Sequence, residues 1–322
     1  ASGEGDPPYP LVPGEPLQLS MRAEQVLSFS LPKDSETIYL VKIDQGGLNL
    51  KVKLHKPGGQ EYIYNFPTGR DDIELVLVET GPDGPQTLTL FTNEFTGAVA
   101  QPRIEITRID EDDVLLPAYR LLTDAAGAYR EFDTELALEK LGQACPLLEG
   151  PETTELFARC QLGLGTLLGW EVVDYDNAAK AVALAEVAYR ESGNRALAAA
   201  ASFLRASFLI EKTGEIEKTP SQGIAPEAQA LFDRSIELQQ QALATQRELG
   251  NRFEAAFILN MIGFTYYTMG EYDKALEFYE PAAEELNALQ EWEYETWPLQ
   301  NIGVINFDRG YLVRARDAFA RN

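Results

Sequence analysis

Few residues in this sequence are suited to covalent or acid–base chemistry. His55 is the only histidine, and the two cysteines are Cys145 and Cys160. A cysteine nucleophile needs a base nearby to take its proton, so a catalytic pair would require one of these thiols to reach His55. His55 falls at the end of a predicted strand, whereas both cysteines fall in predicted helices of the other half. We therefore predict that His55 is an exposed polar residue and that this chain is not an enzyme.

Signals for cofactors and metals are missing from the sequence. No glycine-rich phosphate loop follows a predicted strand, and no spacing of His, Cys, Asp and Glu is typical of metal ligands. The acidic run DEDD at 110–113 suits either a cation or the start of a helix. We favour the helix start, because carboxylates there meet free N–H groups and the positive end of the helix dipole. We expect no cofactor and no metal.

Two interpretations of the cysteines stay open. Two thiols are not a disulfide framework, so Cys145 and Cys160 are either small buried apolar residues or one bridge between neighbouring helices of an exported protein.

The Pro- and Gly-rich start, ASGEGDPPYPLVPGEP, is consistent with a mature end left after signal cleavage or with an arbitrary boundary. We favour an extracytoplasmic location, periplasmic or secreted, over the cytoplasm.

The chain is strongly acidic. Lys and Arg number 27 against 51 Asp and Glu, which gives a formal charge of −24. Such a chain repels phosphate backbones and anionic membranes, and we see no local basic patch. No apolar run is long enough to span a membrane. We expect no nucleic-acid partner and no membrane insertion.

The first half has a hydrophobic period of two, which is typical of strands. In LNLKVKLH, the residues Leu48, Leu50, Val52 and Leu54 lie on one face, and the QGG before it predicts a hairpin with IYLVKID at 38–44. Short strands at this spacing build a β-sandwich or jelly roll. We predict a disordered segment at 1–15 and a β-sandwich domain at 16–109, with strands at 17–21, 25–31, 38–44, 48–55, 60–66, 73–79, 86–92 and 102–109.

From residue 110 the period becomes 3.6, and the sequence repeats itself. Gly263, Gly270, Ala275 and Tyr279 recur 40 residues later as Gly303, Gly310, Ala315 and Phe319. The segment ELGNR at 248–252 likewise echoes ESGNR at 191–195. Correlated matches at fixed offsets indicate stacked helical hairpins.

The repeat resembles the tetratricopeptide repeat (TPR), with a longer period than the usual form of about 34 residues. The residues that carry the resemblance are Leu259, Ile262, Gly263, Tyr266, Ala275, Tyr279 and Ala282. It implies an all-α, right-handed superhelix of hairpins over 110–322. Because the sequence stops inside a second helix, we expect the array to be truncated at its C-terminal end and to form a weak end-to-end homodimer there.

Both halves together resemble the N-terminal region of bacterial TPR–CHAT proteins, in which a small β-sandwich precedes TPRs and a caspase-like CHAT domain. In the β half the resemblance depends on LVPGEPLQLSMRAEQVLSFSL followed by IYLVKIDQGGLNLKVKLHKPGG. It implies a sensor or adaptor region of a larger cysteine-protease protein. The catalytic residues of that family would lie beyond residue 322.

The TPR resemblance also implies which residues face the concave side of the superhelix. This groove would be apolar with amide side chains, and we expect it to bind an apolar or amphipathic protein or peptide segment, such as the missing C-terminal domain of the same chain. The expected groove residues are Phe203, Ile210, Phe257, Asn260, Phe264, Tyr267, Trp297, Gln300, Val304 and Phe307. For the less regular early hairpins we favour a packing role.

We therefore predict a non-enzymatic protein–protein interaction scaffold. The alternative hypothesis is a free-standing TPR scaffold whose β domain binds carbohydrate or a cell-surface partner. A parent gene that ends without a caspase-like His and Cys would favour this alternative.

Overall fold

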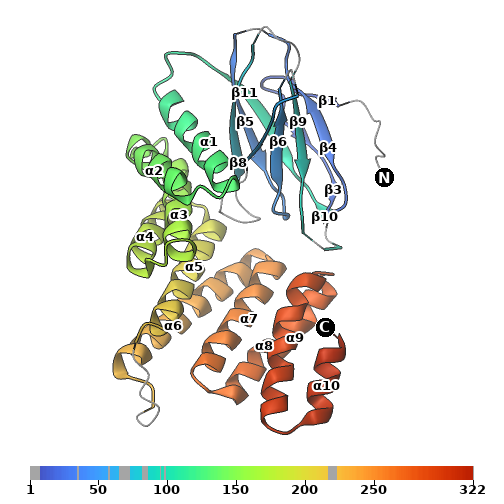
Figure 1. Ribbon diagram of the computed structural model, residues 1–322, viewed down its shortest axis with the longest axis vertical. Helices are drawn as coiled ribbons and strands as arrows, with labels where there is room; N and C mark the ends of the chain where they lie inside the picture. The colour runs from blue at the N-terminus through green and yellow to red at the C-terminus, as the bar shows by residue number, and fades with distance from the viewer. Residues whose placement is uncertain are drawn as a thin grey trace. The chain divides into compact units, whose positions relative to one another are not determined.

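The protein consists of an N-terminal β-rich region followed by a helical region (Figure 1). This computed structural model describes residues 8–321 except 35, 57–58, 65–72, 82–85, 95, 98 and 217–222. The chain divides into two compact units, residues 1–94 with 98–171 and residues 95–97 with 172–322. The domain limits expected from the sequence, 1–15, 16–109 and 110–322, stay predictions. Within the segment expected to be disordered, Tyr9–Pro10 forms strand β1 beside Phe29 and Ser30.

Two main sheets make up the β-rich region. Their orders are β1-β4-β9-β6-β7 and β2-β11-β5-β8. A two-stranded ribbon pairs β3 (Met21–Arg22) with β10 (Val99–Ala100). The other strands are β2 (Leu17–Gln18), β4 (Leu27–Ser30), β5 (Ile38–Asp44), β6 (Lys51–His55), β7 (Glu61–Tyr64), β8 (Ile73–Glu79), β9 (Thr87–Phe91) and β11 (Arg103–Ile109).

Apolar side chains that alternate along these strands build one core between the two sheets. Successive side chains of a strand point to opposite faces, so Phe29 and Leu88 of the first sheet meet Val41, Val76 and Ile104 of the second in one buried cluster. Strand β8 is buried on both faces, because Leu75 and Leu77 on its other side pack against α1 (Leu116–Arg130). This double burial explains why β8 reads IELVLVE rather than alternating with polar residues.

The predicted hairpin between 38–44 and 48–55 is wrong. Strand β5 pairs with β11 and β8, whereas β6 pairs with β7 and β9, so the QGG link passes from one sheet to the other. The buried Gln45 side chain holds this crossing by accepting a hydrogen bond from the N–H of Leu50 at 2.6 Å. Gly46 has a φ of 61°, and a Cβ there would overlap the Gln101 backbone.

A buried ion pair connects β8 to α3 (Thr154–Trp170). Arg159 is 2% exposed and its Nη2 lies 3.9 Å from Oε2 of the fully buried Glu74. Gln45 donates from Nε2 to the same carboxylate at 3.5 Å. Removing one member of such a pair leaves an uncompensated buried charge, so this contact fixes α3 on the sheet.

The two cysteines form a disulfide. The pair is buried and joins Cys145, which begins the short 3₁₀ helix Cys145–Leu148 after α2 (Thr134–Ala144), to Cys160 in α3. Its Cα atoms are 5.5 Å apart and its sequence separation is 15. The sequence left both interpretations open, because the number of thiols says nothing about their distance in the fold.

The second unit contains helical hairpins, and links of two or three residues join its successive helices except α5 and α6, which residues 214–225 separate. Its helices are α4 (Tyr175–Glu191), α5 (Arg195–Thr213), α6 (Pro226–Leu249), α7 (Arg252–Thr268), α8 (Tyr272–Ala288), α9 (Trp292–Asp308) and α10 (Leu312–Arg321). Gly270 and Gly310 end α7 and α9 with φ near 77° and 79°. The N–H groups that follow bond carbonyls five residues back, as Glu271 does with Tyr266. The same bond ends α6 and α8, where Asn251 bonds Gln246 and Glu291 bonds Leu286, so each of these helices ends with the same cap.

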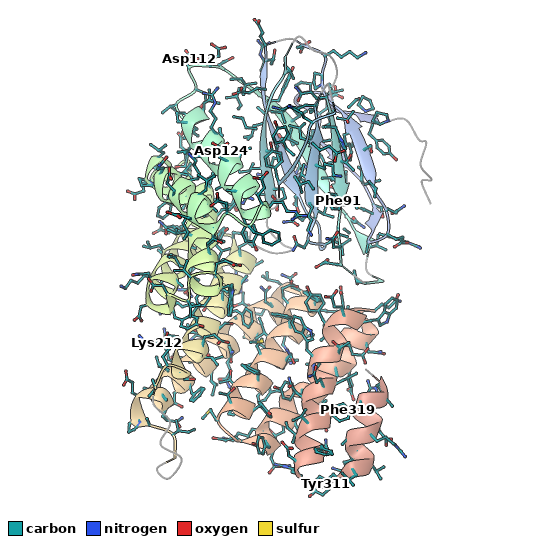
Figure 2. The ribbon with its side chains drawn as sticks, viewed as in Figure 1. Phe91, Asp112, Asp124, Lys212, Tyr311 and Phe319 are labelled. Carbon is teal, nitrogen blue, oxygen red and sulfur yellow. A yellow bond between two sulfur atoms is a disulfide. The ribbon has the colours of Figure 1, made fainter. Side chains whose placement is uncertain are left out.

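Close packing of a glycine on an aromatic ring holds each late hairpin together. A Cβ on Gly263 in α7 would lie 2.8 Å from the fully buried ring of Tyr279 in α8. The equivalent Cβ on Gly303 would overlap the ring of Phe319 in α10, which is labelled in Figure 2. Only glycine lets the two helices of a hairpin approach this closely.

We predict that Gly263→Ala lowers the free energy of unfolding of the second unit by about 1–3 kcal/mol, because the buried Tyr279 ring has no space to move. Gly303→Ala should cost less, because Phe319 is 43% exposed and its ring can turn outward. Urea unfolding followed by tryptophan fluorescence in a Trp170→Phe background measures both values. Equal costs would contradict this explanation.

Reduction of the disulfide should destabilise the first unit. For a closed loop of this length the expected loss is roughly 3 kcal/mol. Trp170 at the end of α3 reports on that unit once Trp292 and Trp297 are replaced by Phe. Dithiothreitol should lower the urea midpoint of this protein and leave the Cys145→Ala/Cys160→Ala variant unchanged; a midpoint insensitive to the reductant would show that the bridge does not constrain the fold.

Candidate binding surface

Five aromatic side chains lie together on the first helices of three successive hairpins. We call Phe203 (α5), Phe253 and Phe257 (α7), and Tyr294 and Trp297 (α9) the aromatic row. Ring centroids are 5.6 Å apart for Phe203 and Phe257, and 5.8 Å apart for Phe257 and Trp297. Tyr294 lies 5.0 Å from both Phe253 and Trp297. The row crosses three helices without a break.

The row offers apolar surface to solvent. Trp297 is 42% exposed, and the four other rings are half-buried. The tilted and edge-on ring contacts are favourable aromatic geometries, so the rings hold one another in position. Rigid aromatic surface of this kind is typical of binding hot spots.

A buried amide lies beside the row. Asn260 in α7 is 4% exposed, and its Oδ1 atom has no hydrogen-bond partner. Its Nδ2 atom reaches Met261 Sδ at 4.0 Å, a weak contact. A buried acceptor without a partner costs free energy, so Asn260 is a site of local strain in α7. Gln300, the equivalent residue of α9, is exposed.

The other expected groove residues have different surroundings. Ile210 is buried in a cluster with Phe232, and Phe264 packs against that cluster. Tyr267 lies 5.6 Å from Tyr272 at the end of its own hairpin. These three residues therefore contribute to packing. Val304 is half-buried, and Phe307 at the end of α9 is exposed.

Sequence reasoning missed two members of the row, Phe253 and Tyr294. Phe253 precedes Phe257 by four residues and Tyr294 precedes Trp297 by three, spacings that place side chains on one face of a helix. These spacings could have identified both residues from the sequence. They were missed because neither residue stands at a position that the TPR resemblance assigns to the groove.

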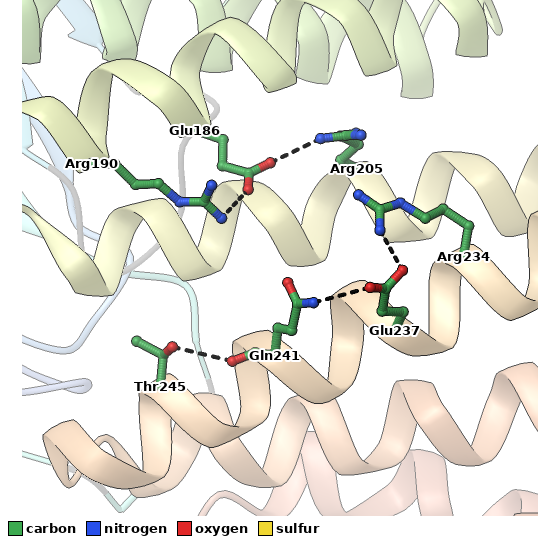
Figure 3. Close-up of polar contacts among 7 residues, drawn as sticks. All are labelled: Glu186, Arg190, Arg205, Arg234, Glu237, Gln241 and Thr245. Atoms are coloured by element: carbon green, nitrogen blue, oxygen red, sulfur yellow. Dashed lines mark hydrogen bonds and ion pairs between the residues drawn. The ribbon is translucent and has the colours of Figure 1, made fainter.

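A buried carboxylate links helices α4 and α5, and a separate chain of polar contacts runs along α6 (Figure 3). Glu186 in α4 is buried and contacts two arginines, Arg190 one turn later and Arg205 of α5 at 3.1 Å. Along α6, Gln241 donates from Nε2 to Glu237 at 3.3 Å, and Arg234 pairs with the same carboxylate. Glu186 is thus satisfied within its own unit.

The first unit has a pocket of about 600 Å³. Tyr62 and Tyr64 line it from β7, and Asp124 and Glu131 line it from α1 and the residue after it. Burial, the largest cause, raises the pKa of Tyr64 to about 12, so its hydroxyl stays protonated and able to donate. The pocket combines tyrosine rings with carboxylates.

His55 and the cysteines do not form a nucleophile and base. Both cysteines are in the disulfide, and His55 is half-buried rather than exposed. Its ring contacts Glu61 at 3.0 Å and Thr89 at 2.9 Å on the neighbouring strands β7 and β9. Within the described residues, no group of three or more His, Cys, Asp or Glu side chains is placed to hold a metal ion. Nor does any helix in that part have the length and apolarity needed to cross a membrane.

A family comparison matches part of the helical region. Residues 224–285 match the tetratricopeptide repeat model, a span that includes α6, α7 and most of α8. A comparison with curated proteins found no match.

Among solved structures, the apo form of RapI is similar over 66% of this chain and 70% of its own, with 15% identity and a TM-score of 0.53. This likeness shows the fold alone. A Rap regulator of plasmid pLS20, solved with the Phr* peptide, has 15% identity and a TM-score of 0.47, covering 65% of this chain and 52% of its own. The pre-peptidase C-terminal domain of a Bacillus anthracis collagenase has 8% identity and a TM-score of 0.24. The match covers 33% of this chain and 99% of the collagenase domain. Together, the fold and the repeat match define a TPR-type helical region after a β-rich region.

We predict that Phe253 and Tyr294 are energetically coupled. In a double-mutant cycle with Phe253→Leu and Tyr294→Leu, their edge-on contact should give a coupling of about 0.5–1.5 kcal/mol. Phe253 with Phe307, which lies near the other end of α9, is the matched control pair and should be additive. Urea unfolding of the unsubstituted protein, the three single variants and the two double variants measures both couplings. Coupling as large in the control pair would show that the effect is not the ring contact.

Proposed function

We propose that the helical region is a non-enzymatic scaffold that binds a protein or peptide segment along the aromatic row. The observation that carries this proposal is the continuous aromatic surface from α5 to α9, with Trp297 partly exposed. The segment is apolar or amphipathic, because the row offers rings and no charged group of its own.

The charge of the chain supports a mainly apolar mode of recognition. With a formal charge of −24, the protein repels acidic segments at long range and attracts basic ones. An amphipathic segment with apolar residues on one side and Lys or Arg on the other satisfies both conditions. Apolar contact then gives the affinity, and charge gives the rate of encounter.

The finer architecture belongs to the same proposal. We infer that the β-rich region is a β-sandwich with jelly-roll-like order and that the helices form a TPR superhelix whose concave side carries the row. The sequence resemblance to TPR–CHAT proteins supports a role as the sensor or adaptor part of a larger CHAT-type cysteine-protease protein. In that case a domain of the same protein is a candidate for the bound segment.

A second candidate function concerns the first unit. Its pocket of about 600 Å³ places Tyr62 and Tyr64 near Asp124 and Glu131, and tyrosine rings beside carboxylates suit the faces and hydroxyls of a sugar. This observation favours the alternative of a carbohydrate-binding β domain on a free-standing scaffold.

Peptide selection tests the main proposal. Short random peptides displayed on phage are selected on the protein, and synthetic copies are titrated into a Trp170→Phe/Trp292→Phe variant, in which Trp297 is the remaining tryptophan. We expect apolar or basic-amphipathic peptides whose binding shifts Trp297 emission to shorter wavelength. In a separate assay, Trp297→Ser should weaken binding by roughly 2 kcal/mol or more, as expected for a hot spot.

The matched control is Phe307→Ser, which removes an exposed ring of the same helix outside the row. The binding free energy of a selected peptide to this variant should differ from that of the unsubstituted protein by only about a few tenths of a kcal/mol. Selected peptides that bind Trp297→Ser as tightly as the unsubstituted protein, or a selection that yields no binder, would contradict the proposal.

A further inference from the structure

A second, smaller pocket lies on the face of α7 opposite the aromatic row. It has a volume of about 280 Å³ and is lined by Arg247 of α6, Arg252 and Ala255 of α7, and Pro281 and Glu285 of α8, among others. Each helical residue turns the chain by about 100°, so Ala255 points away from Phe257, which follows two residues later. The pocket is therefore separate from the proposed peptide surface.

The preceding hairpin has an equivalent pocket that is already neutralised. The alignment of ESGNR with ELGNR places Arg190, Arg195 and Ala198 at the positions of Arg247, Arg252 and Ala255. All three line a pocket of about 180 Å³. There, Glu186 pairs with Arg190 from the same helix (Figure 3). In this pocket the chain itself supplies the carboxylate partner of Arg190.

The following hairpin fills the equivalent space with a carboxylate of its own. The 40-residue repeat places Asn287, Glu295 and Arg321 at the positions of Arg247, Ala255 and Pro281. Glu295 is 5% exposed. Its two oxygens accept hydrogen bonds from Asn287 Nδ2 at 2.8 Å and from Arg321 Nη2 at 3.2 Å. The space between three successive helices is thus able to hold a desolvated carboxylate.

In the middle pocket, Arg252 has a carboxylate partner, and among the described residues Arg247 has none. Four residues before Arg247 stands Leu243, where Arg190 has Glu186, and Ala255 replaces Glu295. Arg252 is held by Glu285 at 2.5 Å, so these two charges cancel. Throughout the described part of the chain, no ion pair or hydrogen bond engages the Arg247 side chain. One positive charge is therefore left over at an open pocket in a chain with a formal charge of −24.

We propose that this pocket binds a carboxylate of a partner polypeptide, from an acidic side chain or a chain end, with Arg247 as its counterion. The carboxylate occupies the space left by Ala255, as Glu295 does one hairpin later. Charge-assisted hydrogen bonds from a guanidinium to a carboxylate are the strong class of such contacts. The site is independent of the aromatic row, and each can fail without the other.

The probe is N-acetyl-glutamate N-methylamide, a glutamate with both backbone ends blocked, titrated into protein labelled with ¹⁵N-arginine. We expect a saturable shift of the Arg247 Nε–H signal, assigned as the one that Arg247→Gln removes. The blocked glutamine analogue, with the same shape and no charge, should give no saturable shift. Glutarate, a free dicarboxylate, should bind more weakly than blocked glutamate, because it lacks the amides of a polypeptide.

Two variants make the test specific. Ala255→Glu supplies the missing side chain, so the Arg247 signal should shift without any probe, and the blocked glutamate should lose at least about tenfold in affinity. Arg190→Gln in the equivalent pocket is the matched control, because Arg190 stands at the position of Arg247 and its partner Glu186 keeps Arg205; it should leave binding at Arg247 unchanged, with unaltered circular dichroism. No saturable shift at Arg247, equal shifts with the glutamine analogue, or tighter binding of glutarate would each overturn the proposal.

Discussion

The contact of a helical glycine with an aromatic ring of the next helix is the constraint on which the helical region depends. Gly263 accepts the buried Tyr279 ring at a distance that leaves no room for a Cβ, and Gly303 makes the same close contact with the partly exposed Phe319 ring. This contact occupies one side of the first helix and leaves another side for contact with the neighbouring hairpins. Phe257 and Trp297 stand six residues before Gly263 and Gly303, about 120° around the helix from them, and they meet one another across hairpins. The packing rule of the repeat thus also creates its candidate binding surface.

Repetition gives each hairpin the same set of surfaces, and differences between hairpins then become informative. The position of Ala255 holds alanine in one hairpin and glutamate in the next. Where glutamate is present, Asn287 and Arg321 bind it; where it is absent, a pocket and the Arg247 cation remain. The aromatic row and the arginine pocket lie on opposite faces of α7. One scaffold can therefore contact two segments, or two parts of one partner, at the same time.

Much of the architecture was predictable from periodicity, because strand and helix patterns are local. Strands at 38–44, 73–79 and 102–109 were predicted within a residue of their observed ends, and the 40-residue phase placed Gly263 and Tyr279 correctly. The hairpin at QGG was wrong because the choice between pairing and crossing depends on where Gln45 and Leu50 find buried partners, not on the turn residues. Three of the expected groove residues, Phe203, Phe257 and Trp297, lie in the row, while Ile210 packs inside. The disulfide and the arginine pocket depend on distances between helices, which no local pattern encodes.

The central claim is that the first helices of the hairpins, rather than the second, present the binding surface. Hydrogen–deuterium exchange with and without a selected peptide tests it most directly, because exchange is measured on every helix at once. The account predicts added protection in α5, α7 and α9, strongest around Phe257 and Trp297, with α6, α8 and α10 unchanged. Protection confined to α6, α8 and α10, or spread evenly over both sets, would contradict it.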